Sequence, residues 1–134
     1  MKLIRLGTSA VAAGLVILAC GESGPDDNRC DVALNFQVTP GLTPVFSWSP
    51  VCTVAQVRVV KEAEGDDPEV EVWSVVAGGN TIGAPVTYGA APAGTTETTP
   101  EAVLTLGDAY RLIVAVRSPE TGVLLVGGLY PFTP

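Results

Sequence analysis

The sequence predicts an all-β fold, a single antiparallel β-sandwich, and three observations support this. From Asp31 onward apolar side chains tend to alternate with polar ones, which is the period of a strand with one buried face. The chain of 134 residues contains 15 glycines and 11 prolines, so turns are frequent. Its apolar residues are largely Val, Leu and Ala, with few aromatic residues and few helical signals, which suits short strands joined by turns.

Seven or so strands are predicted over about 100 residues, the size of a sandwich domain. In the first strand, Val32 to Val38, every second side chain is apolar and faces inward. The second strand contains Phe46 and Trp48 on one side and ends at Pro50. The others are, in chain order, Val54 to Ala63, Glu69 to Val76, Glu101 to Leu106, Tyr110 to Arg117 and Val123 to Phe132.

Two segments between these strands differ from the strands in composition. The acidic turn Glu64 to Pro68 joins the third and fourth strands, which are therefore expected to form a hairpin. The stretch Ala77 to Pro100 is dense in Gly, Ala, Pro and Thr and contains one short extended piece, Ile82 to Tyr88. Because Pro85 has no amide hydrogen, this piece is expected at a sheet edge or outside strand structure.

The N-terminus has the layout of a secretion signal. Two cations, Lys2 and Arg5, precede the mostly apolar run Leu6 to Ala19. That run has 14 residues, whereas about 20 are needed to cross a bilayer. We therefore expect the segment to be removed rather than kept as a membrane helix.

The apolar run ends in Ile17-Leu18-Ala19-Cys20, which resembles the lipobox of bacterial lipoproteins: a branched apolar residue, a variable residue and a small residue before a cysteine. The resemblance implies a lipid on Cys20, cleavage after Ala19 and acylation of the new N-terminus. Several acyl chains hold a protein stably on a membrane, because each buried CH₂ contributes about 0.8 kcal/mol. The alternative is an ordinary cleaved signal followed by a coincidental cysteine.

The number of cysteines supports the lipid. Three cysteines in an exported chain would leave one unpaired. If Cys20 is acylated, Cys30 and Cys52 remain, and in an oxidising compartment we expect them to form a disulfide worth roughly 3 kcal/mol. Metal binding by these two cysteines is the alternative, but zinc sites need four ligands at closer spacing.

Residues 20–30 are expected to be a lipidated cysteine and a flexible acidic tether. Gly21 to Asn28 has no apolar side chain and contains Gly, Pro, Ser and acids. A calcium loop is the alternative, but the acids lack the alternating spacing of calcium ligands. The predicted organisation is a signal peptide over 1–19, this tether over 20–30 and the sandwich over 31–134.

Two short motifs resemble the fibronectin type III and immunoglobulin-like families. Phe46 to Pro50, with the sequence FSWSP, is similar to their second strand, with Trp48 at the position of the core tryptophan. Leu104 to Tyr110, with the sequence LTLGDAY, is similar to the tyrosine corner that opens their sixth strand, although Leu106 replaces the usual proline. The resemblance implies that the Tyr110 hydroxyl bonds the backbone a few residues upstream.

The composition argues against catalysis and against nucleic-acid binding. Histidine is absent, which removes the commonest general base and the commonest transition-metal ligand. Without Lys2 and Arg5, five cations stand against fourteen acids, and such a surface disfavours phosphate binding. We therefore expect no enzyme activity, no cofactor and no bound metal.

Six acids crowd the predicted hairpin of the third and fourth strands, and their expected role is to solvate the turn and discourage edge pairing. Calcium binding, and glycoside hydrolysis by paired carboxylates, are the alternatives. The six are Glu62, Glu64, Asp66, Asp67, Glu69 and Glu71.

A partner-facing surface is predicted from strand alternation. If the more apolar face of Glu69 to Val76 is the core face, Trp73 points outward. The same count turns Arg58 outward on the third strand, and Arg111 and Arg117 outward on the sixth. Trp and Arg dominate binding hot spots, so these four residues form the candidate surface. The alternative is that Trp73 covers its own sheet or packs under the long Gly/Pro-rich segment.

The expected function is a non-enzymatic interaction or structural module, anchored by lipid in the bacterial cell envelope. The alternative is a lipoprotein that captures carbohydrate or another small ligand, with Trp73 as its stacking platform. Gly21, rather than the aspartate that marks inner-membrane retention in enteric bacteria, follows Cys20, which favours the outer membrane. The expected partners are the membrane, through the lipid, and an envelope protein or glycan.

Overall fold

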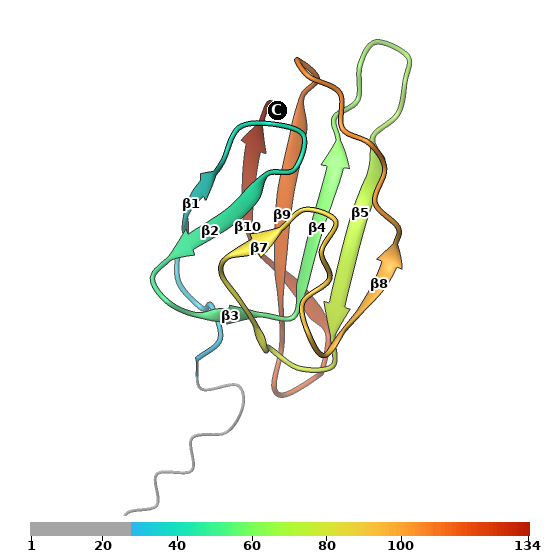
Figure 1. Cartoon of the computed structure of the whole chain (residues 1–134). Coiled ribbons are helices and arrows are strands. Elements are labelled where there is room, and N and C mark those ends of the chain that lie inside the picture. Colours follow the sequence, from blue (N-terminus) through green and yellow to red (C-terminus); the bar gives the residue numbers. More distant parts are fainter. Residues whose placement is uncertain (1–27) are drawn as a thin grey trace, which may run out of the picture.

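The computed structural model describes residues 28–134, which contain ten strands and no helix. The all-β prediction is therefore confirmed for this range, while the predicted signal peptide, Cys20 and most of the tether lie outside it. The strands are β1 (Asn35–Val38), β2 (Val45–Ser49), β3 (Thr53–Val54), β4 (Gln56–Lys61), β5 (Val70–Ala77), β6 (Ile82–Gly83), β7 (Val86–Thr87), β8 (Thr95–Thr99), β9 (Tyr110–Arg117) and β10 (Leu124–Phe132) (Figure 1).

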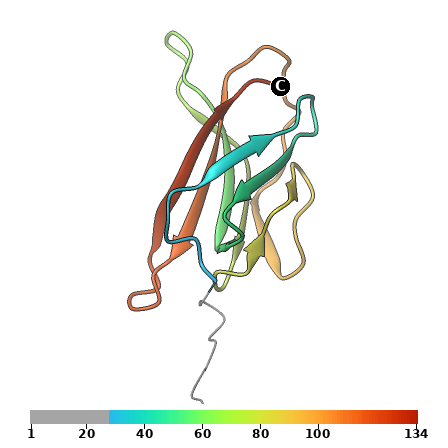
Figure 2. The same cartoon turned by 90° about the vertical axis from the view of Figure 1, so that its left-hand side faces the viewer.

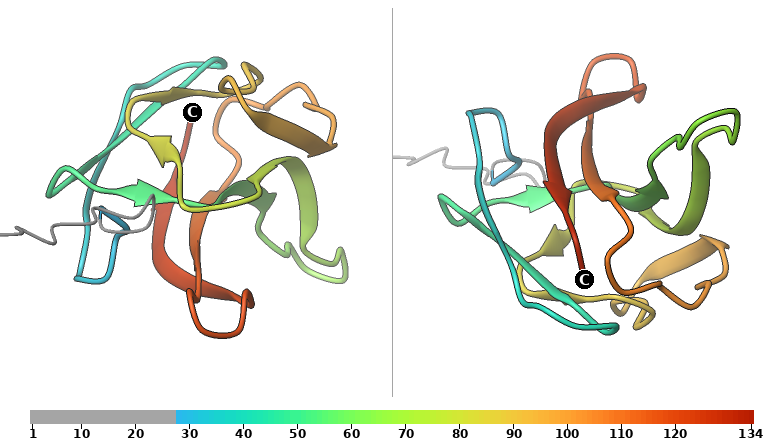
Figure 3. Two further views of the ribbon diagram at one scale, coloured as in Figure 1. Left: turned by 90° about the horizontal axis from the view of Figure 1, so that it is seen from below. Right: turned by 90° about the horizontal axis from the view of Figure 1, so that it is seen from above.

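The strands form two larger antiparallel sheets that face each other. One has the order β1-β2-β7 and the other the order β10-β9-β4-β5-β8, while β3 and β6 pair with each other (Figure 3). Aromatic rings join the two layers: the Phe46 and Phe132 centroids lie 5.5 Å apart, and those of Phe36 and Tyr130 lie 5.9 Å apart. The apolar core fills the space between the sheets.

The core follows the predicted alternation in the strands at its centre. Phe46 and Trp48 of β2 are 0% and 6% exposed, and both belong to the core cluster, as expected. On β9, Tyr110, Leu112 and Val114 are buried on the inward face. Each fully buried side chain of this size contributes about 1.5–3 kcal/mol, so these strands supply much of the stability.

Strand β1 is shorter than predicted, because its partner β2 ends too early. Asn35 pairs with Ser49, the last residue of β2, so residues 31–34 have no strand beside them in this sheet. Val32, expected to face the core, is 52% exposed, whereas Leu34 still packs against the core. The domain begins before residue 31, the predicted boundary, because Arg29 forms an isolated β-bridge with Thr53.

The predicted strand Val54 to Ala63 is divided between two sheets. Its first residue, Val54, belongs to β3, which pairs with β6, whereas β4 lies between β5 and β9. At the junction the amide of Ala55 donates to the Ala115 carbonyl at 2.8 Å, and its carbonyl accepts from the Ala77 amide at 2.8 Å. The chain passes from β3 to β4 here without a turn residue. The run of β-branched residues therefore shows no break where one sheet ends and the next begins. The hairpin of β4 with β5 is confirmed.

The Gly/Pro-rich segment contains more strand than expected. Strands β6 and β7 lie on either side of Pro85, and each has a single neighbouring strand, which confirms the prediction of edge positions. Strand β8 was not predicted; it pairs with β5 at the edge of the larger sheet. Its sequence, TTETT, has no apolar alternation, and its three central residues are exposed.

No strand forms over the predicted range Glu101 to Leu106, where the chain instead crosses from β8 to β9 (Figure 1). Leu104 is buried, at 3% exposure. The backbone amide of Thr105 donates to the Tyr110 hydroxyl at 2.9 Å. The upstream backbone bond that the tyrosine-corner resemblance implied is therefore present, and it fixes the crossing segment at the start of β9.

Candidate functional site

Trp73 is fully buried, so the prediction that it faces outward is wrong. The cause is a β-bulge in β5: Val59 pairs with Trp73, but the next residue, Val60, pairs with Glu71, which leaves Val72 as an extra residue. One extra residue reverses the inward and outward faces of the strand beyond it. The alternation that holds up to Val72 therefore predicts the wrong face for Trp73.

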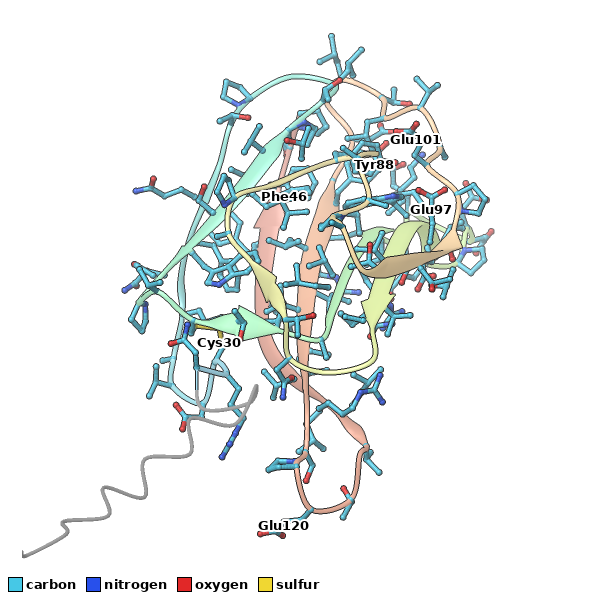
Figure 4. All side chains as sticks on the ribbon, turned by 60° about the horizontal axis from the view of Figure 1, so that its bottom comes forward. Cys30, Phe46, Tyr88, Glu97, Glu101 and Glu120 are labelled. Carbon is cyan, nitrogen blue, oxygen red and sulfur yellow. A yellow bond between two sulfur atoms is a disulfide. The ribbon has the colours of Figure 1, made fainter. Side chains whose placement is uncertain are left out.

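Trp73 packs beneath the Gly/Pro-rich segment, which was the alternative interpretation. Its ring meets that of Tyr88 edge-on, with centroids 5.4 Å apart. Its indole Nε1 donates to the Glu97 carboxylate of β8 at 3.2 Å, which satisfies the polar edge of the ring. Figure 4 shows Tyr88 and Glu97 on this segment. Trp73 is therefore a core residue and offers no stacking platform.

Arg58 faces outward, as the count predicted, but it is held by its own sheet. Its Nε donates to Glu71 Oε2 at 2.6 Å, and about a third of each side chain is exposed. Glu71 also accepts a hydrogen bond from the Thr99 hydroxyl. This chain of contacts links β4, β5 and β8 on the outer face of the larger sheet.

Arg111 also faces outward and is bound to the acidic hairpin. Its Nε lies 3.7 Å from Glu62 Oε1, and its guanidinium forms a second ion pair with Glu69. Lys61 pairs with Asp108 at 2.9 Å, and this partner raises the lysine pKa. Three of the six acids of this hairpin, Glu62, Glu69 and Glu71, therefore form ion pairs with arginines of the same domain.

Arg117 joins the ends of two strands. Its guanidinium donates to the Gly122 carbonyl at 2.8 Å and to the Ala77 carbonyl at 3.1 Å. The buried side chain of Asn80 accepts from the Arg117 amide at 2.7 Å and donates to its carbonyl at 2.9 Å. Arg117 therefore connects the β9–β10 hairpin with the end of β5.

The four predicted residues do not form one surface. Arg58, Arg111 and Arg117 lie on the outer face of the larger sheet, whereas Trp73 lies on its inner face. The pairing of β4 with β5 creates the bulge, and the bulge turns Trp73 into the core. The one signal in the sequence is the loss of apolar alternation in Val72-Trp73-Ser74-Val75-Val76.

The Cys30–Cys52 disulfide is confirmed, and it fixes the point where the chain enters the domain. Both cysteines are buried, and their Cα atoms lie 5.0 Å apart (Figure 4). The Thr53 amide donates to the Asn28 carbonyl at 2.7 Å, and the Cys30 amide donates to the Thr53 carbonyl at 2.8 Å. The predicted lipid site, Cys20, lies outside the described residues.

A hollow of about 400 Å³ is lined by residues of the β1–β2 loop, by Tyr88 just after β7 and by the segment between β8 and β9. The β1–β2 loop lies at the end of the domain away from the start of the described chain (Figure 1). The Glu101 carboxylate lines the hollow and lies against Gly89. Gly89 has a φ of +80°, a backbone conformation that favours glycine. The hollow is lined by Leu42, Thr43, Tyr88, Glu101, Ala102, Val103 and Leu104.

The side chains that line this hollow include one tyrosine and one carboxylate. Burial raises the pKa of Tyr88 to about 12, so its hydroxyl stays protonated and donates to the Ala102 carbonyl at 2.5 Å. Leu42 and Val103 on the rim are 44% and 89% exposed. The hollow is lined by this apolar rim together with the polar residues Thr43 and Glu101.

Within residues 28–134, no group of three or more Cys, Asp or Glu side chains is placed to hold a metal ion. No helix in that part of the chain is long and apolar enough to cross a membrane.

No protein-family model, no curated protein and no solved structure matches the chain.

Proposed function

We propose that the protein is a lipid-anchored interaction module of the bacterial cell envelope. The proposal is carried by the difference between the two ends of the domain. The chain enters at one end, where the disulfide and the Asn28–Thr53 bond hold it, while the β1–β2 loop and the open hollow lie at the opposite end (Figures 1 and 2). A lipid at Cys20 would turn that opposite end away from the membrane.

We further propose that the domain is a β-sandwich of the immunoglobulin-like kind. In that fold the strands A, B and E share one sheet, and the strands C, F and G share the other. The orders β1-β2-β7 and β4-β9-β10 match these two sets, with β5 and β8 added beside β4. The Tyr110 hydrogen bond and the buried Trp48 support the same assignment, whereas β8, which follows β7 in the chain, departs from it.

Replacing Cys20 with serine is expected to abolish lipid attachment and to release the protein from membranes. A single residue carries all of the acyl chains in this proposal, and without them the acidic domain has no stable anchor. Metabolic labelling with a radioactive fatty acid, followed by membrane fractionation, measures both effects. The Ser23→Ala variant of the same tether is the control and should keep label and membrane association. A wild-type chain that takes up no label and leaves the membrane in a salt wash would contradict the proposal.

A photoreactive amino acid in place of Val103 is expected to form light-dependent adducts with an envelope protein in intact cells. Val103 is 89% exposed on the rim of the hollow, where an apolar partner would bury it. The Leu42→Asp change on the same rim should remove the adducts, which are detected on immunoblots. The same probe at Val51, which is 90% exposed beside Asn28, is the matched control. Adducts that form equally from both positions, or that survive Leu42→Asp, would count against a partner at this hollow.

The carbohydrate-capture alternative loses its main support. It relied on Trp73 as the stacking platform, and Trp73 is at 0% exposure in the core.

A further inference from the structure

Exposed apolar side chains gather at the end of the domain where the chain enters. Two open hollows lie there: one of about 340 Å³ between residues 30–33 and β10, and a smaller one beside Asn28. Half of the large exposed apolar side chains among the described residues belong to this end. They are Val32 (52% exposed), Val51 (90%), Val123 (55%), Leu125 (53%) and Val126 (64%).

The length of chain outside the described residues limits how far this end can move from Cys20. Asn28 is held against Thr53, and eight peptide units separate it from Cys20. Fully extended, eight residues span at most about 28 Å. The segment at residues 30–33 and the β9–β10 hairpin lie at this same end (Figures 1 and 2). A lipid on Cys20 therefore keeps the exposed apolar residues close to the bilayer.

The distribution of charge favours the same orientation. The β4–β5 hairpin, which carries most of the acids of the described residues, lies at the opposite end (Figures 1 and 2). Among the described residues near the tether the charges balance, with Asp31 and Glu120 against Arg29 and Arg117, while the tether itself adds Glu22, Asp26 and Asp27. An apolar end whose described residues carry no net charge meets lipid headgroups with less electrostatic repulsion than the acidic end would meet at an anionic surface.

We propose that this tether end lies directly on the bilayer, with Val32, Leu125 and Val126 in the headgroup region, so that the domain is oriented and not merely suspended. The inference rests on the proposed lipid anchor. A second copy of the chain is the other occupant to consider, through the edge strand β10. An antiparallel pair of β10 strands, the more stable pairing, would point the two tethers in opposite directions, which two anchors in one membrane do not allow.

The test is hydrogen–deuterium exchange on the full lipidated chain in phosphatidylcholine vesicles, compared with the Cys20→Ser chain in solution. Exchange at residues 30–34 and 120–127 is expected to slow by roughly tenfold on the vesicles, and exchange around Val103 is expected to stay unchanged. The Val32→Asp, Val126→Asp double variant should stay anchored and lose this protection. The matched Leu42→Asp, Val103→Asp double variant should keep it.

Each other outcome overturns the contact. Equal exchange on vesicles and in solution, or protection that survives Val32→Asp with Val126→Asp, contradicts it. Protection that rises with the ratio of protein to lipid assigns the surface to a second copy instead. The sample is selected by its fatty-acid label, so a chain without label refutes the anchor and the contact together, whereas labelled protein without protection refutes the contact alone.

Discussion

Replacing Trp73 with alanine is expected to destabilise the domain by about 3–5 kcal/mol, the range found when a large core ring is truncated. Trp73 is fully buried, its ring packs on Tyr88, and its indole nitrogen bonds Glu97. Truncation would leave a cavity under the Gly/Pro-rich segment and remove the hydrogen-bond donor to Glu97. Small domains are stable by about 5–15 kcal/mol, so the loss is a large part of the whole. Urea denaturation followed by circular dichroism measures it.

The Trp48→Ala and Val103→Ala variants are the controls for Trp73→Ala. Trp48 is 6% exposed and donates to the Cys52 carbonyl at 3.0 Å, so Trp48→Ala should cost about as much as Trp73→Ala. Val103→Ala, at an 89% exposed position, should change stability by less than about 0.5 kcal/mol. If Trp73→Ala resembles Val103→Ala rather than Trp48→Ala, Trp73 does not lie in the core and the bulge in β5 is wrongly placed.

Removing the Cys30–Cys52 disulfide is expected to lower the free energy of unfolding by about 3 kcal/mol. The bond closes a loop with a sequence separation of 22 residues, and the effect follows from the smaller chain entropy of the cross-linked unfolded state. The Cys30→Ala, Cys52→Ala double variant and the reduced wild-type chain should show similar midpoints in urea. Reduction should leave the midpoint of the double variant unchanged.

The mass of the intact protein tests the disulfide directly. The intact mass of the mature wild-type chain should rise by the mass of two hydrogen atoms on reduction. Two thiols that react freely with an alkylating agent in the native protein, or a double variant as stable as wild type, would show that the bond contributes nothing to this fold.

Features that depend on a single strand or on residue counts could be predicted from the sequence alone. Alternation along a strand predicted the all-β class, the buried face of β9 and the core positions of Phe46 and Trp48. The acidic turn predicted the β4–β5 hairpin, because turn residues act locally. The odd number of cysteines, with Cys20 set aside, predicted the partner of Cys30.

Features that depend on which strands lie side by side could not be predicted from the sequence and emerge in the folded chain. An extra residue in β5 is defined by its pairing with β4, so the sequence of one strand does not record it, and Trp73 was assigned to the wrong face. The polar strand β8 exists because β5 offers it a free edge for backbone hydrogen bonds. The hollow beside Glu101 and the apolar tether end likewise bring together segments far apart in the chain. Alternation reports burial within one strand, whereas register and long-range contact are properties of pairs.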